Sequence, residues 1–248
     1  VRRVNRVALK IELVAVDEAH CISQWGHDFR PDYLRINQAI RSIGRPQIIA
    51  LTATATEKVR SDIVKYLNLK APRVFITGFD RRNLFWEVTQ CADEKEKTAK
   101  MMERLSGLSG AAIVYTGTRK NVERNVKKLN KSNLRAEAYH AGLDEAERTR
   151  VQENFMEGRT NLVVATNAFG MGVDKADIRY VVHVEIPGSL ESYYQEIGRA
   201  GRDGKDALCL LLYNQDDIMT HMEFIRWSNP EPLFYQQLYD VLQKDIQK

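Results

Sequence analysis

Short apolar runs alternate along the chain with segments in which apolar residues recur at every third or fourth position. Apolar runs bounded by turn residues are typical of strands buried in a parallel sheet, and the wider spacing predicts amphipathic helices. The predicted strands cover residues 11–16, 47–51, 84–88, 111–115, 136–139, 162–165, 180–184 and 208–213. The predicted helices cover residues 31–44, 95–105, 120–130, 145–156, 190–197, 216–227 and 232–246.

The order of these elements predicts the fold class. From Asn83 onward strands and helices alternate, which predicts an α/β domain with a parallel sheet and helices on both faces. One further helix is expected after residue 51, because Thr54-Ala-Thr-Glu57 is typical of a capping box. Residues 71–82 carry proline, glycine, aspartate and arginine, a composition that predicts a link between two domains.

Two carboxylates, Asp17 and Glu18, follow the first predicted strand. Ligands of open α/β sheets bind at the carboxyl ends of strands. A first acid at this position can hold a magnesium ion through its waters, and a second can orient and deprotonate an attacking water. An apolar strand followed by two acids is also an ordinary solvated strand end, so the pair alone leaves both interpretations open.

The loop after these acids carries two aromatic residues among polar ones. Trp25 and Phe29 lie among Ser23, Gln24, His27 and Arg30, and flanks of this polarity favour a loop over a core. Exposed aromatic rings beside cationic side chains can stack on unpaired nucleic-acid bases. The alternative is that both rings fold back into a local cluster.

Polar residues also follow three strands of the second predicted domain. Backbone amides freed by glycines, with hydroxyls beside them, are suited to phosphate oxygens. Each stretch alone is weak evidence, because most α/β sheets have Gly and Thr in their turns. The stretches are Thr116-Gly-Thr118-Arg119, His140-Ala-Gly142 and Thr166-Asn-Ala-Phe169-Gly-Met-Gly172-Val-Asp174.

Two arginines, Arg199 and Arg202, lie at the end of the helix predicted at residues 190–197, after Gln195. Small residues between them allow the backbone to approach a partner surface closely. An arginine that reaches a transferring phosphoryl group can raise a rate by about 10³–10⁵. The alternative is that both cations only complement the dipole of the helix.

Composition limits the class of protein. The 248 residues suffice for one or two domains, and 37 lysines and arginines against 33 acids give a net charge of +4. This mildly basic balance is compatible with a nucleic-acid partner. The three cysteines are far apart and form no CxxC, so we expect no zinc cluster or disulfide framework within this chain, and we expect a reducing compartment. No apolar run approaches the ~20 residues that span a bilayer, so we expect no membrane partner.

A phosphate-binding loop of the form G-x-x-x-x-G-K-[ST] is missing from the sequence. The only Gly-Lys pair is Gly204-Lys205, which is followed by Asp206. The chain begins at Val1 and reaches a predicted strand almost at once. We therefore expect that it is a piece of a longer protein, that its first domain is incomplete, and that these residues alone do not turn over ATP.

Asp17-Glu-Ala-His20, followed by Ser23-Gln-Trp-Gly-His-Asp-Phe-Arg-Pro31, resembles helicase motif II and the aromatic-rich loop of RecQ-family DNA helicases, which belong to superfamily 2. Thr52-Ala-Thr54 resembles motif III, and the three polar stretches of the second domain resemble motifs IV, IVa and V. Gln195-Glu-Ile-Gly-Arg199-Ala-Gly-Arg202 resembles motif VI. The resemblance runs from about residue 14 to residue 213. The chain departs from the family at Arg82, where relatives often have proline.

The resemblance implies tandem RecA-like parallel sheets with helices on both faces, the first domain incomplete, and a short helical C-terminal extension. The implied domains are residues 1–80, 81–213 and 214–248. The implied activity is that of a DNA-stimulated ATPase and 3′-to-5′ DNA helicase in recombination and repair. Its ligands would be ATP, Mg²⁺ and single-stranded and forked DNA, and its location the cytoplasm, at the nucleoid of a bacterium, or the nucleus of a eukaryote.

The resemblance also assigns roles to residues. Asp17 would hold Mg²⁺, Glu18 would activate water, Arg202 would be the arginine finger, and Arg199 would couple the domains. The other implied catalytic residues are His20 and Gln195, and the other nucleotide contacts are Gly172 and Asp174, with Thr52 and Thr54 coupling ATP state to DNA. The implied DNA contacts are Ser23, Gln24, Trp25, His27, Phe29, Arg30, Thr118, Arg119, His140, Thr166 and Phe169.

Two other classes of function remain open from the sequence. The chain could be a non-catalytic nucleic-acid-binding module that keeps the surface of a helicase without its motor. It could also belong to another superfamily 2 translocase, such as an RNA helicase or a chromatin remodeller. The loop from Ser23 to Pro31 disfavours the last interpretation, since the DEAH tetrad alone is shared with those proteins.

Overall fold

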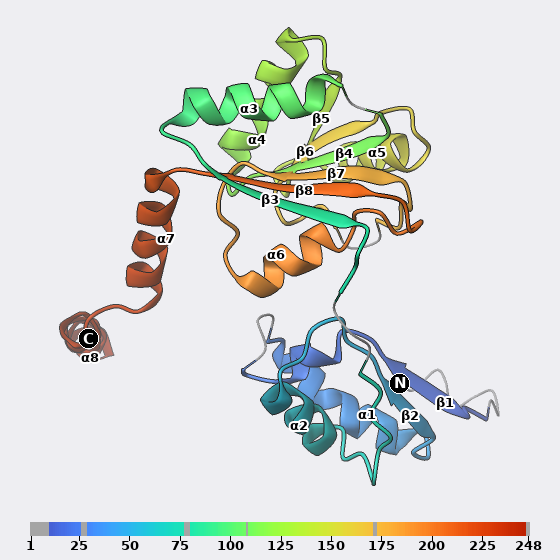
Figure 1. Ribbon diagram of the computed structural model, residues 1–248. Coiled ribbons are helices and arrows are strands. Elements are labelled where there is room, and N and C mark those ends of the chain that lie inside the picture. Colours follow the sequence, from blue (N-terminus) through green and yellow to red (C-terminus); the bar gives the residue numbers. More distant parts are fainter. Residues whose placement is uncertain (1–9, 26–28, 77–79, 108, 171–172, 247–248) are drawn as a thin grey trace. The chain divides into compact units, whose positions relative to one another are not determined.

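The computed structural model describes residues 10–25, 29–76, 80–107, 109–170 and 173–246. By contacts the chain divides into two compact units, of which the first holds residues 1–80 with 189–195 and the second holds residues 81–188 with 196–248 (Figure 1). We call these unit 1 and unit 2 and describe each by itself.

Unit 1 is built on a two-stranded parallel sheet of β1 (Leu13–Val16) and β2 (Gln47–Ala50). The register pairs Leu13 with Gln47 and Val16 with Ala50, so both strands end at the same edge. The short 3-10 helix η2 (Ala19–Ile22) follows β1, helix α1 (Ile36–Ser42) precedes β2, and helix α2 (Glu57–Tyr66) follows β2. Its core consists of Val16, Ala19, Ile22, Ile40, Val59, Ile63 and Leu67.

Unit 1 differs from the sequence prediction in two places. The helix predicted over residues 31–44 is a 3-10 helix, η3 (Pro31–Arg35), followed by α1. No side chain of η3 is fully buried: Leu34 is 42% exposed, and only Tyr33 packs against the core, so little packing holds these residues in an α-helix. The cap of α2 is Thr56 rather than Thr54, because the Thr56 hydroxyl accepts the hydrogen bond from the Val59 amide.

The strands of unit 1 are less buried than a parallel sheet core predicts. Leu13 is 55% exposed and Ile49 is 43% exposed, whereas Val16 at the end of β1 is 4% exposed. A sheet of two strands leaves apolar side chains without neighbours on one face, and this accounts for the difference.

Unit 2 contains a six-stranded sheet whose order is β3-β8-β7-β4-β6-β5. All of its paired strands are parallel, which confirms the α/β fold predicted from the alternation of elements. Its strands are β3 (Leu84–Gln90), β4 (Ala111–Tyr115), β5 (Ala136–Tyr139), β6 (Leu162–Ala165), β7 (Ile178–His183) and β8 (Ala207–Tyr213). Its helices are α3 (Glu94–Ser106), α4 (Arg119–Lys131), α5 (Glu145–Met156), α7 (Gln215–Ser228) and α8 (Pro232–Ile246), and α6 (Leu190–Ile197) lies mostly in unit 1 by contacts.

The two faces of this sheet are covered by different helices. Met101 of α3 and Leu129 of α4 pack with Ala136 and other residues of one face, where α3 and α4 lie in Figure 1. Successive side chains of a strand point to opposite faces, so Tyr139 points away from Ala136. On that side its ring lies 4.7 Å from the ring of Phe169, which in turn meets Phe155 of α5.

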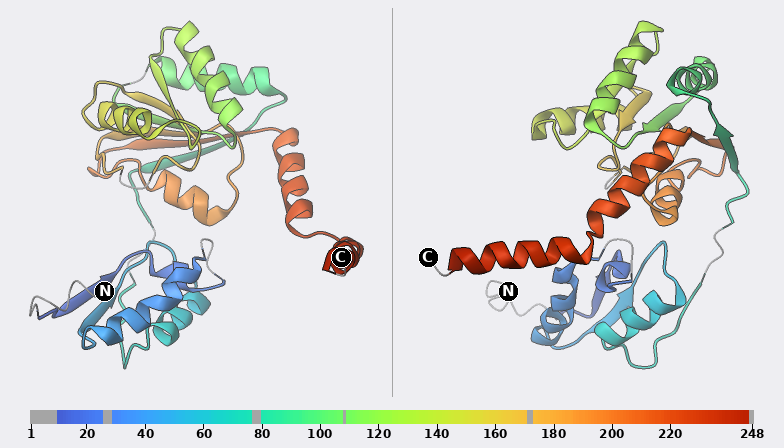
Figure 2. Two further views of the ribbon diagram at one scale, coloured as in Figure 1. Left: turned by 180° about the vertical axis from the view of Figure 1, so that it is seen from behind. Right: turned by 90° about the vertical axis from the view of Figure 1, so that its left-hand side faces the viewer.

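A buried ion pair fixes the start of α7, which follows β8 directly (Figure 2). Lys97 of α3 is 2% exposed, and its ammonium donates to both carboxylate oxygens of Asp217 at 2.8 Å. Asp217 also completes the capping box of α7 with Asn214. In the described part of the chain no helix, α7 and α8 included, has the length and apolarity needed to cross a membrane.

Candidate functional site

The carboxyl end of β1 presents Asp17 and Glu18 to solvent. The Glu18 amide donates to the Asp17 Oδ1 at 2.9 Å, so one carboxylate oxygen of Asp17 is already oriented. Glu18 adopts a left-handed backbone conformation, with φ of 47° and ψ of 40°. Such a conformation is uncommon for a residue with a side chain and is found disproportionately at functional sites. It is a property that the sequence pattern did not predict.

His20 joins the ends of the two strands of unit 1. Its side chain is 1% exposed, and its Nδ1 lies 2.9 Å from the Thr52 Oγ1 in a hydrogen bond. The same Nδ1 lies 3.3 Å from the Glu18 carboxylate. The Thr52 hydroxyl also bonds the backbone of Thr54, whose own hydroxyl is buried without a partner among the described residues. The structure therefore brings Glu18, His20, Thr52 and Thr54 together.

In the loop after η2, the Ser23 side chain is buried and hydrogen-bonded, whereas the Trp25 side chain is exposed. Ser23 is 0% exposed and donates to the Asp62 carboxylate of α2 at 2.6 Å. Its hydroxyl also accepts from the Trp25 amide, which holds Trp25 beside α2. The Trp25 ring is 68% exposed, and the Lys58 ammonium lies 3.2 Å from its centroid in a cation–π contact.

These contacts change the assignment of one loop residue. Ser23 was predicted to contact DNA, but its buried hydroxyl is committed to Asp62 and to the loop backbone, so it supports the loop. Gln24, Trp25 and Arg30 are exposed and Phe29 is half-buried. His27 lies outside the described residues.

In unit 2, two predicted DNA-binding stretches lie together. Arg119 begins α4, and the position that a side chain on Gly142 would occupy is 3.0 Å from the Arg119 guanidinium. His140 is 7% exposed, lies 3.0 Å from Glu123 and accepts from the Gly142 amide, so its ring is committed within the protein. The Thr118 hydroxyl caps α4. Of these predicted contacts Thr118 and Arg119 are exposed, and only His140 is buried.

Phe169 is a correction to the sequence prediction. It was expected to contact DNA, but it is 1% exposed and packs against Tyr139 and Phe155. Its ring is therefore part of the core of unit 2 and is not available to a base. Its carbonyl accepts from the Tyr115 hydroxyl at 2.9 Å, and burial raises the pKa of Tyr115 well above its ordinary value, which keeps this hydroxyl a donor. Thr166 is half-buried and bonds the Ala168 amide.

Both arginines of the predicted motif VI contact the loop after β6. Arg199 donates to the Gly170 carbonyl at 2.6 Å, and a side chain at residue 170 would collide with its guanidinium. Arg202 donates to the Asp174 carboxylate at 2.6 Å and to the Val173 carbonyl at 3.4 Å. The structure therefore brings Arg199, Arg202 and Asp174 together. Gly172 lies outside the described residues, and Gln195 is half-buried in the last turn of α6.

Two acids that support these stretches were missed by sequence reasoning. Asp62 accepts a hydrogen bond from Ser23. It interrupts the apolar face of α2 between Val59 and Ile63, and this interruption could have been recognised in the sequence. Glu185 accepts from the Thr116 hydroxyl, from the Gly117 amide at 2.8 Å and from Asn121 at 2.6 Å. It follows an apolar strand in the same way as Asp17, so the same rule would have found it.

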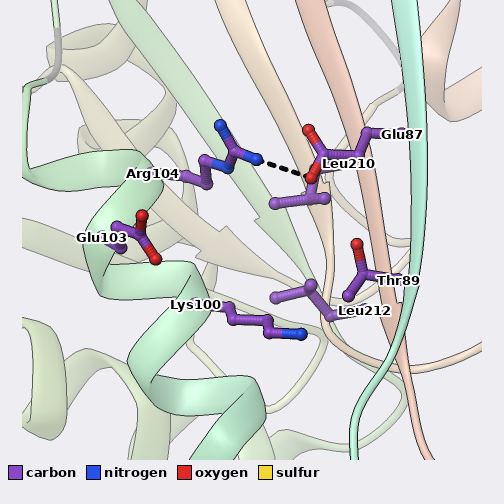
Figure 3. A pocket seen from close by; sticks show the side chains of 7 residues that line it. All are labelled: Glu87, Thr89, Lys100, Glu103, Arg104, Leu210 and Leu212. Atoms are coloured by element: carbon purple, nitrogen blue, oxygen red, sulfur yellow. Dashed lines mark hydrogen bonds and ion pairs between the residues drawn. The ribbon is translucent and has the colours of Figure 1, made fainter.

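A pocket of about 170 Å³ lies between α3 and the β3–β8 edge of the second sheet (Figure 3). Arg104 and Glu87 form an ion pair at 2.6 Å across it. None of the predicted site residues lines it. The lining residues are Glu87, Thr89, Lys100, Glu103, Arg104, Leu210 and Leu212.

Two protein-family profiles match the sequence. The DEAD/DEAH box helicase profile matches residues 2–62, and the helicase conserved C-terminal domain profile matches residues 96–204. The structure is similar to the yeast (Saccharomyces cerevisiae) Dbp5 L327V bound to RNA and ADP BeF3, with a TM-score of 0.70, 22% identity and 91% and 59% of the two chains covered. A Mycobacterium smegmatis helicase Lhr bound to ssDNA and AMP-PNP gives a TM-score of 0.69 at 21% identity over 89% and 31%. The two profiles identify the two domain types of DEAD/DEAH box helicases in this chain, and the solved structures have the same fold.

Curated relatives narrow this class. The chain is 44% identical to the ATP-dependent DNA helicase RecQ of Bacillus subtilis over 93% of its own length and 39% of that protein. It is 44% identical to the mouse bifunctional 3′-5′ exonuclease/ATP-dependent helicase WRN over 86% of its own length and 16% of that protein. The chain is a homologue of the RecQ-family ATP-dependent DNA helicases. It spans 33–47% of the length of three bacterial relatives that it matches.

Proposed function

We propose that this chain carries motor residues of a RecQ-type DNA helicase, which translocates 3′-to-5′ along single-stranded DNA by hydrolysing ATP. The observation that carries the proposal is the connection from Glu18 through His20 to Thr52, next to a loop that exposes Trp25. It links a residue suited to activating water with a ring suited to stacking on a base. The loop and the homology to RecQ helicases together favour DNA over RNA as the substrate.

In unit 1, Glu18 is the proposed general base. Its side chain is 52% exposed, so a water can reach it, and the buried His20 beside it fixes its direction. The left-handed backbone of Glu18 turns the carboxylate at the strand end, where substrates of α/β sheets bind. The hydrogen bond from the Glu18 amide orients the Asp17 carboxylate through Oδ1. Its other carboxylate oxygen is left for a ligand.

ATP and Mg²⁺ are the cofactors that the family implies; Asp17 fits the magnesium ion, whereas the loop that holds nucleotide phosphates is missing from this sequence. Magnesium usually keeps several waters and takes one or two carboxylates beside the phosphates of a nucleotide, so one exposed acid such as Asp17 is the kind of ligand it uses. The described residues contain no group of three or more His, Cys, Asp or Glu that would form a complete metal site. When bound, the ion supplies charge neutralisation at the phosphates.

In unit 2, Arg202 is the proposed arginine finger, and Arg199 is the residue proposed to couple the two domains. Arg202 pairs with Asp174, whose side chain is 85% exposed, so this contact is screened by solvent and weak enough to be exchanged for a phosphate. Arg199 donates to the Gly170 carbonyl, so in this proposal its position follows that of the loop after β6.

The proposal is tested with the full-length gene product. We expect it to unwind a DNA duplex with a 3′ single-stranded tail when ATP and magnesium are supplied, and to leave 5′-tailed DNA and 3′-tailed RNA duplexes intact. Glu18→Gln should abolish unwinding and ATP hydrolysis while single-stranded DNA binding survives, since the amide cannot take a proton. Glu145→Gln, a substitution of the same kind at the exposed start of α5, is the matched control.

Three results would contradict the proposal in different ways. Binding of single-stranded DNA without any ATP-dependent unwinding would indicate a non-catalytic binding module. Unwinding of the RNA duplex in preference to DNA would indicate another superfamily 2 helicase. Equal loss of DNA binding and of hydrolysis in Glu18→Gln would remove Glu18 from the role of general base.

A further inference from the structure

The first residue of unit 2 is hydrogen-bonded to the turn that carries both arginines. We call residues 198–204 the arginine turn. Arg81 donates to the Gly198 carbonyl at 2.9 Å and to the Gly201 carbonyl at 2.6 Å, across more than one hundred residues of sequence. These carbonyls flank Arg199, so the guanidinium fork of Arg81 spans the segment in which that arginine is anchored.

Asn83 makes a second contact from the same segment. Its side-chain amide donates to the Gly201 carbonyl at 2.8 Å and to the Lys205 carbonyl at 2.9 Å. Arg202 lies between these two carbonyls. A Cβ atom at residue 201 would come within 2.5 Å of the Asn83 amide nitrogen, so the close approach of Asn83 requires glycine there. The Gly201 carbonyl therefore accepts two side-chain hydrogen bonds at once.

Backbone bonds hold the opposite side of the arginine turn. The Gly201 amide donates to the Ile178 carbonyl at 2.9 Å, and the Asp203 amide donates to the Ala176 carbonyl at 3.2 Å. These bonds attach the turn to the start of β7. Arg81 and Asn83 add side-chain donors to carbonyls of the turn, including that of the buried Gly201, which also accepts from the Gly204 amide at 3.0 Å.

We propose that Arg81 and Asn83 are positioning residues for the two arginines of the motor. This inference rests on the proposed function, because it takes Arg199 and Arg202 as groups that act during ATP hydrolysis. Arg81 and Asn83 do not touch the nucleotide in this scheme. They fix the carbonyls on either side of each arginine, and so they fix the direction in which the guanidinium groups leave the backbone.

The chemistry of the two side chains is specific to this task. A guanidinium presents several donors in a rigid plane and reaches two carbonyls at once, whereas a lysine ammonium is a point charge on a flexible stem. An asparagine amide likewise has two donors on one nitrogen. Arg81→Lys is therefore expected to behave like a loss of the contact, although it keeps the charge.

The first experiment is a double-mutant cycle in the full-length gene product. Arg81→Ala should lower the DNA-stimulated kcat for ATP by about 10–100-fold with little change in KM, because small misplacements of catalytic groups carry losses of about this size. In an Arg202→Ala background the same substitution should lower kcat by less than about twofold, since a residue that acts through Arg202 has nothing left to position. Arg104→Ala, which removes a surface ion pair with Glu87 in the same unit, is the control.

The second experiment measures amide hydrogen exchange and needs no activity. Arg81→Ala and Asn83→Ala should speed exchange at the Gly201 and Asp203 amides while exchange in β4 and β6 is unchanged. A loss of kcat that is equally large with and without Arg202, or unchanged exchange in the arginine turn, would overturn the inference. If Arg81→Ala does not fold, Asn83→Ala and Arg81→Lys carry both tests.

The two experiments separate this inference from the proposed function. If the wild-type protein hydrolyses no ATP, the proposed function fails, and the exchange rates still decide whether Arg81 and Asn83 hold the arginine turn. If hydrolysis is robust and the cycle is additive, the proposed function stands and the positioning role is wrong.

Discussion

His20 and Thr52 lie 2.9 Å apart through Nδ1 and Oγ1, although 32 residues separate them in the sequence. Each follows the end of a different strand, and the parallel register of β1 and β2 places those ends at one edge. His20 is almost fully buried, so this bond is made where water does not compete for it. The proposed general base and the predicted coupling residue therefore belong to one hydrogen-bonded group.

The first prediction concerns that bond. Thr52→Val keeps the shape of the side chain and removes the hydroxyl. In the full-length gene product we expect the stimulation of ATP hydrolysis by single-stranded DNA to fall by about 5–150-fold, the usual range of a coupling free energy, while the rate without DNA stays within about twofold. Thr149→Val is the control, because its exposed hydroxyl bonds only a carbonyl of its own helix. Equal loss of both rates would assign Thr52 a role in folding or catalysis instead of coupling.

The second prediction concerns Trp25. Its ring is 68% exposed, so Trp25→Ala should change the free energy of unfolding by no more than about 1 kcal/mol, which includes the cation–π contact with Lys58. The same substitution should weaken binding of single-stranded DNA by about 1–3 kcal/mol and remove DNA stimulation of the ATPase. The basal ATPase rate should survive.

The matched control for Trp25 is Trp86→Ala, because Trp86 is a similarly exposed tryptophan on the edge strand β3. Fluorescence anisotropy of a labelled oligonucleotide measures DNA affinity, and urea unfolding measures stability. Equal weakening of DNA binding by both substitutions would show a general effect of surface aromatics, and a large loss of stability in Trp25→Ala would place the ring in a core.

Trp25 and Phe169 show what the sequence could and could not predict. Both are aromatic residues in a loop after a strand, and the resemblance to helicase motifs assigned both to DNA. Phe169 is buried because Tyr139 and Phe155, which are distant in sequence, approach it in the fold. Local patterns carry no information on such partners, so this class of assignment is where the sequence prediction fails.

The strands and the strand-end chemistry were predictable for a physical reason. A parallel strand buried on both faces must be apolar along its whole length. The sequences of β4 and β6 are apolar in this way, so both strands could be predicted. The 3-10 helix at Pro31–Arg35 was not predictable, because its spacing of apolar residues matches an α-helix and the sequence does not show how few of its side chains pack against the core. The arginine turn could be read from its sequence, but its contacts with Arg81 and Asn83 could not.

The third prediction concerns Arg202. Arg202→Ala should lower kcat for ATP hydrolysis in the full-length gene product by about 10³–10⁵-fold, because the arginine stabilises charge that develops on the transferring phosphoryl group. Arg202→Lys should restore little of this rate, since it lacks the planar fork. Arg150→Ala, which breaks an exposed ion pair with Glu137, should leave kcat unchanged. A loss of nucleotide affinity as large as the loss of kcat would make Arg202 a binding residue only.

The fourth prediction concerns alkaline pH. All three cysteines are buried and outside any disulfide, and burial raises the pKa of Cys209 from 9.0 to about 12, against the opposing effect of the Arg81 charge. The unfolded chain loses the thiol proton above its ordinary pKa, whereas the folded chain keeps it. Folding therefore binds a proton in this range, and stability that is complete below the unfolded pKa is lost as the pH rises towards the folded pKa.

Urea unfolding at about pH 8 and about pH 10, followed by circular dichroism, checks this sign. Cys209→Ala should be less stable than the wild type at the lower pH, because it leaves a small cavity, and should lose less stability on going to the higher pH. Cys91→Ala is the parallel variant, since burial also raises the pKa of that thiol. It measures the part of the pH-dependent loss of stability that comes from Cys91 and not from Cys209. A wild-type chain whose stability rises with pH over this range would contradict the assignment.

The last prediction compares two glycines of the arginine turn. Gly201 and Gly204 both have left-handed φ angles, of 55° and 80°. An alanine at either position meets the same backbone strain, about 1–2 kcal/mol. A Cβ at residue 204 would touch nothing within 4 Å, whereas a Cβ at residue 201 would meet the Asn83 amide at 2.5 Å and the Lys205 carbonyl at 2.7 Å.

The difference between Gly201→Ala and Gly204→Ala therefore separates the contacts of the added Cβ, with the Asn83 amide and the Lys205 carbonyl, from the strain of the backbone. Native-state hydrogen exchange of the β7 and β8 amides should show Gly201→Ala to be the less stable variant by a further ~1–3 kcal/mol, the usual range for overpacking. In Asn83→Ala the added methyl group has one obstacle fewer, so the extra loss should shrink. If the two alanine variants are equally stable, Asn83 does not restrict residue 201, and the close contact that holds the arginine turn has no energetic consequence.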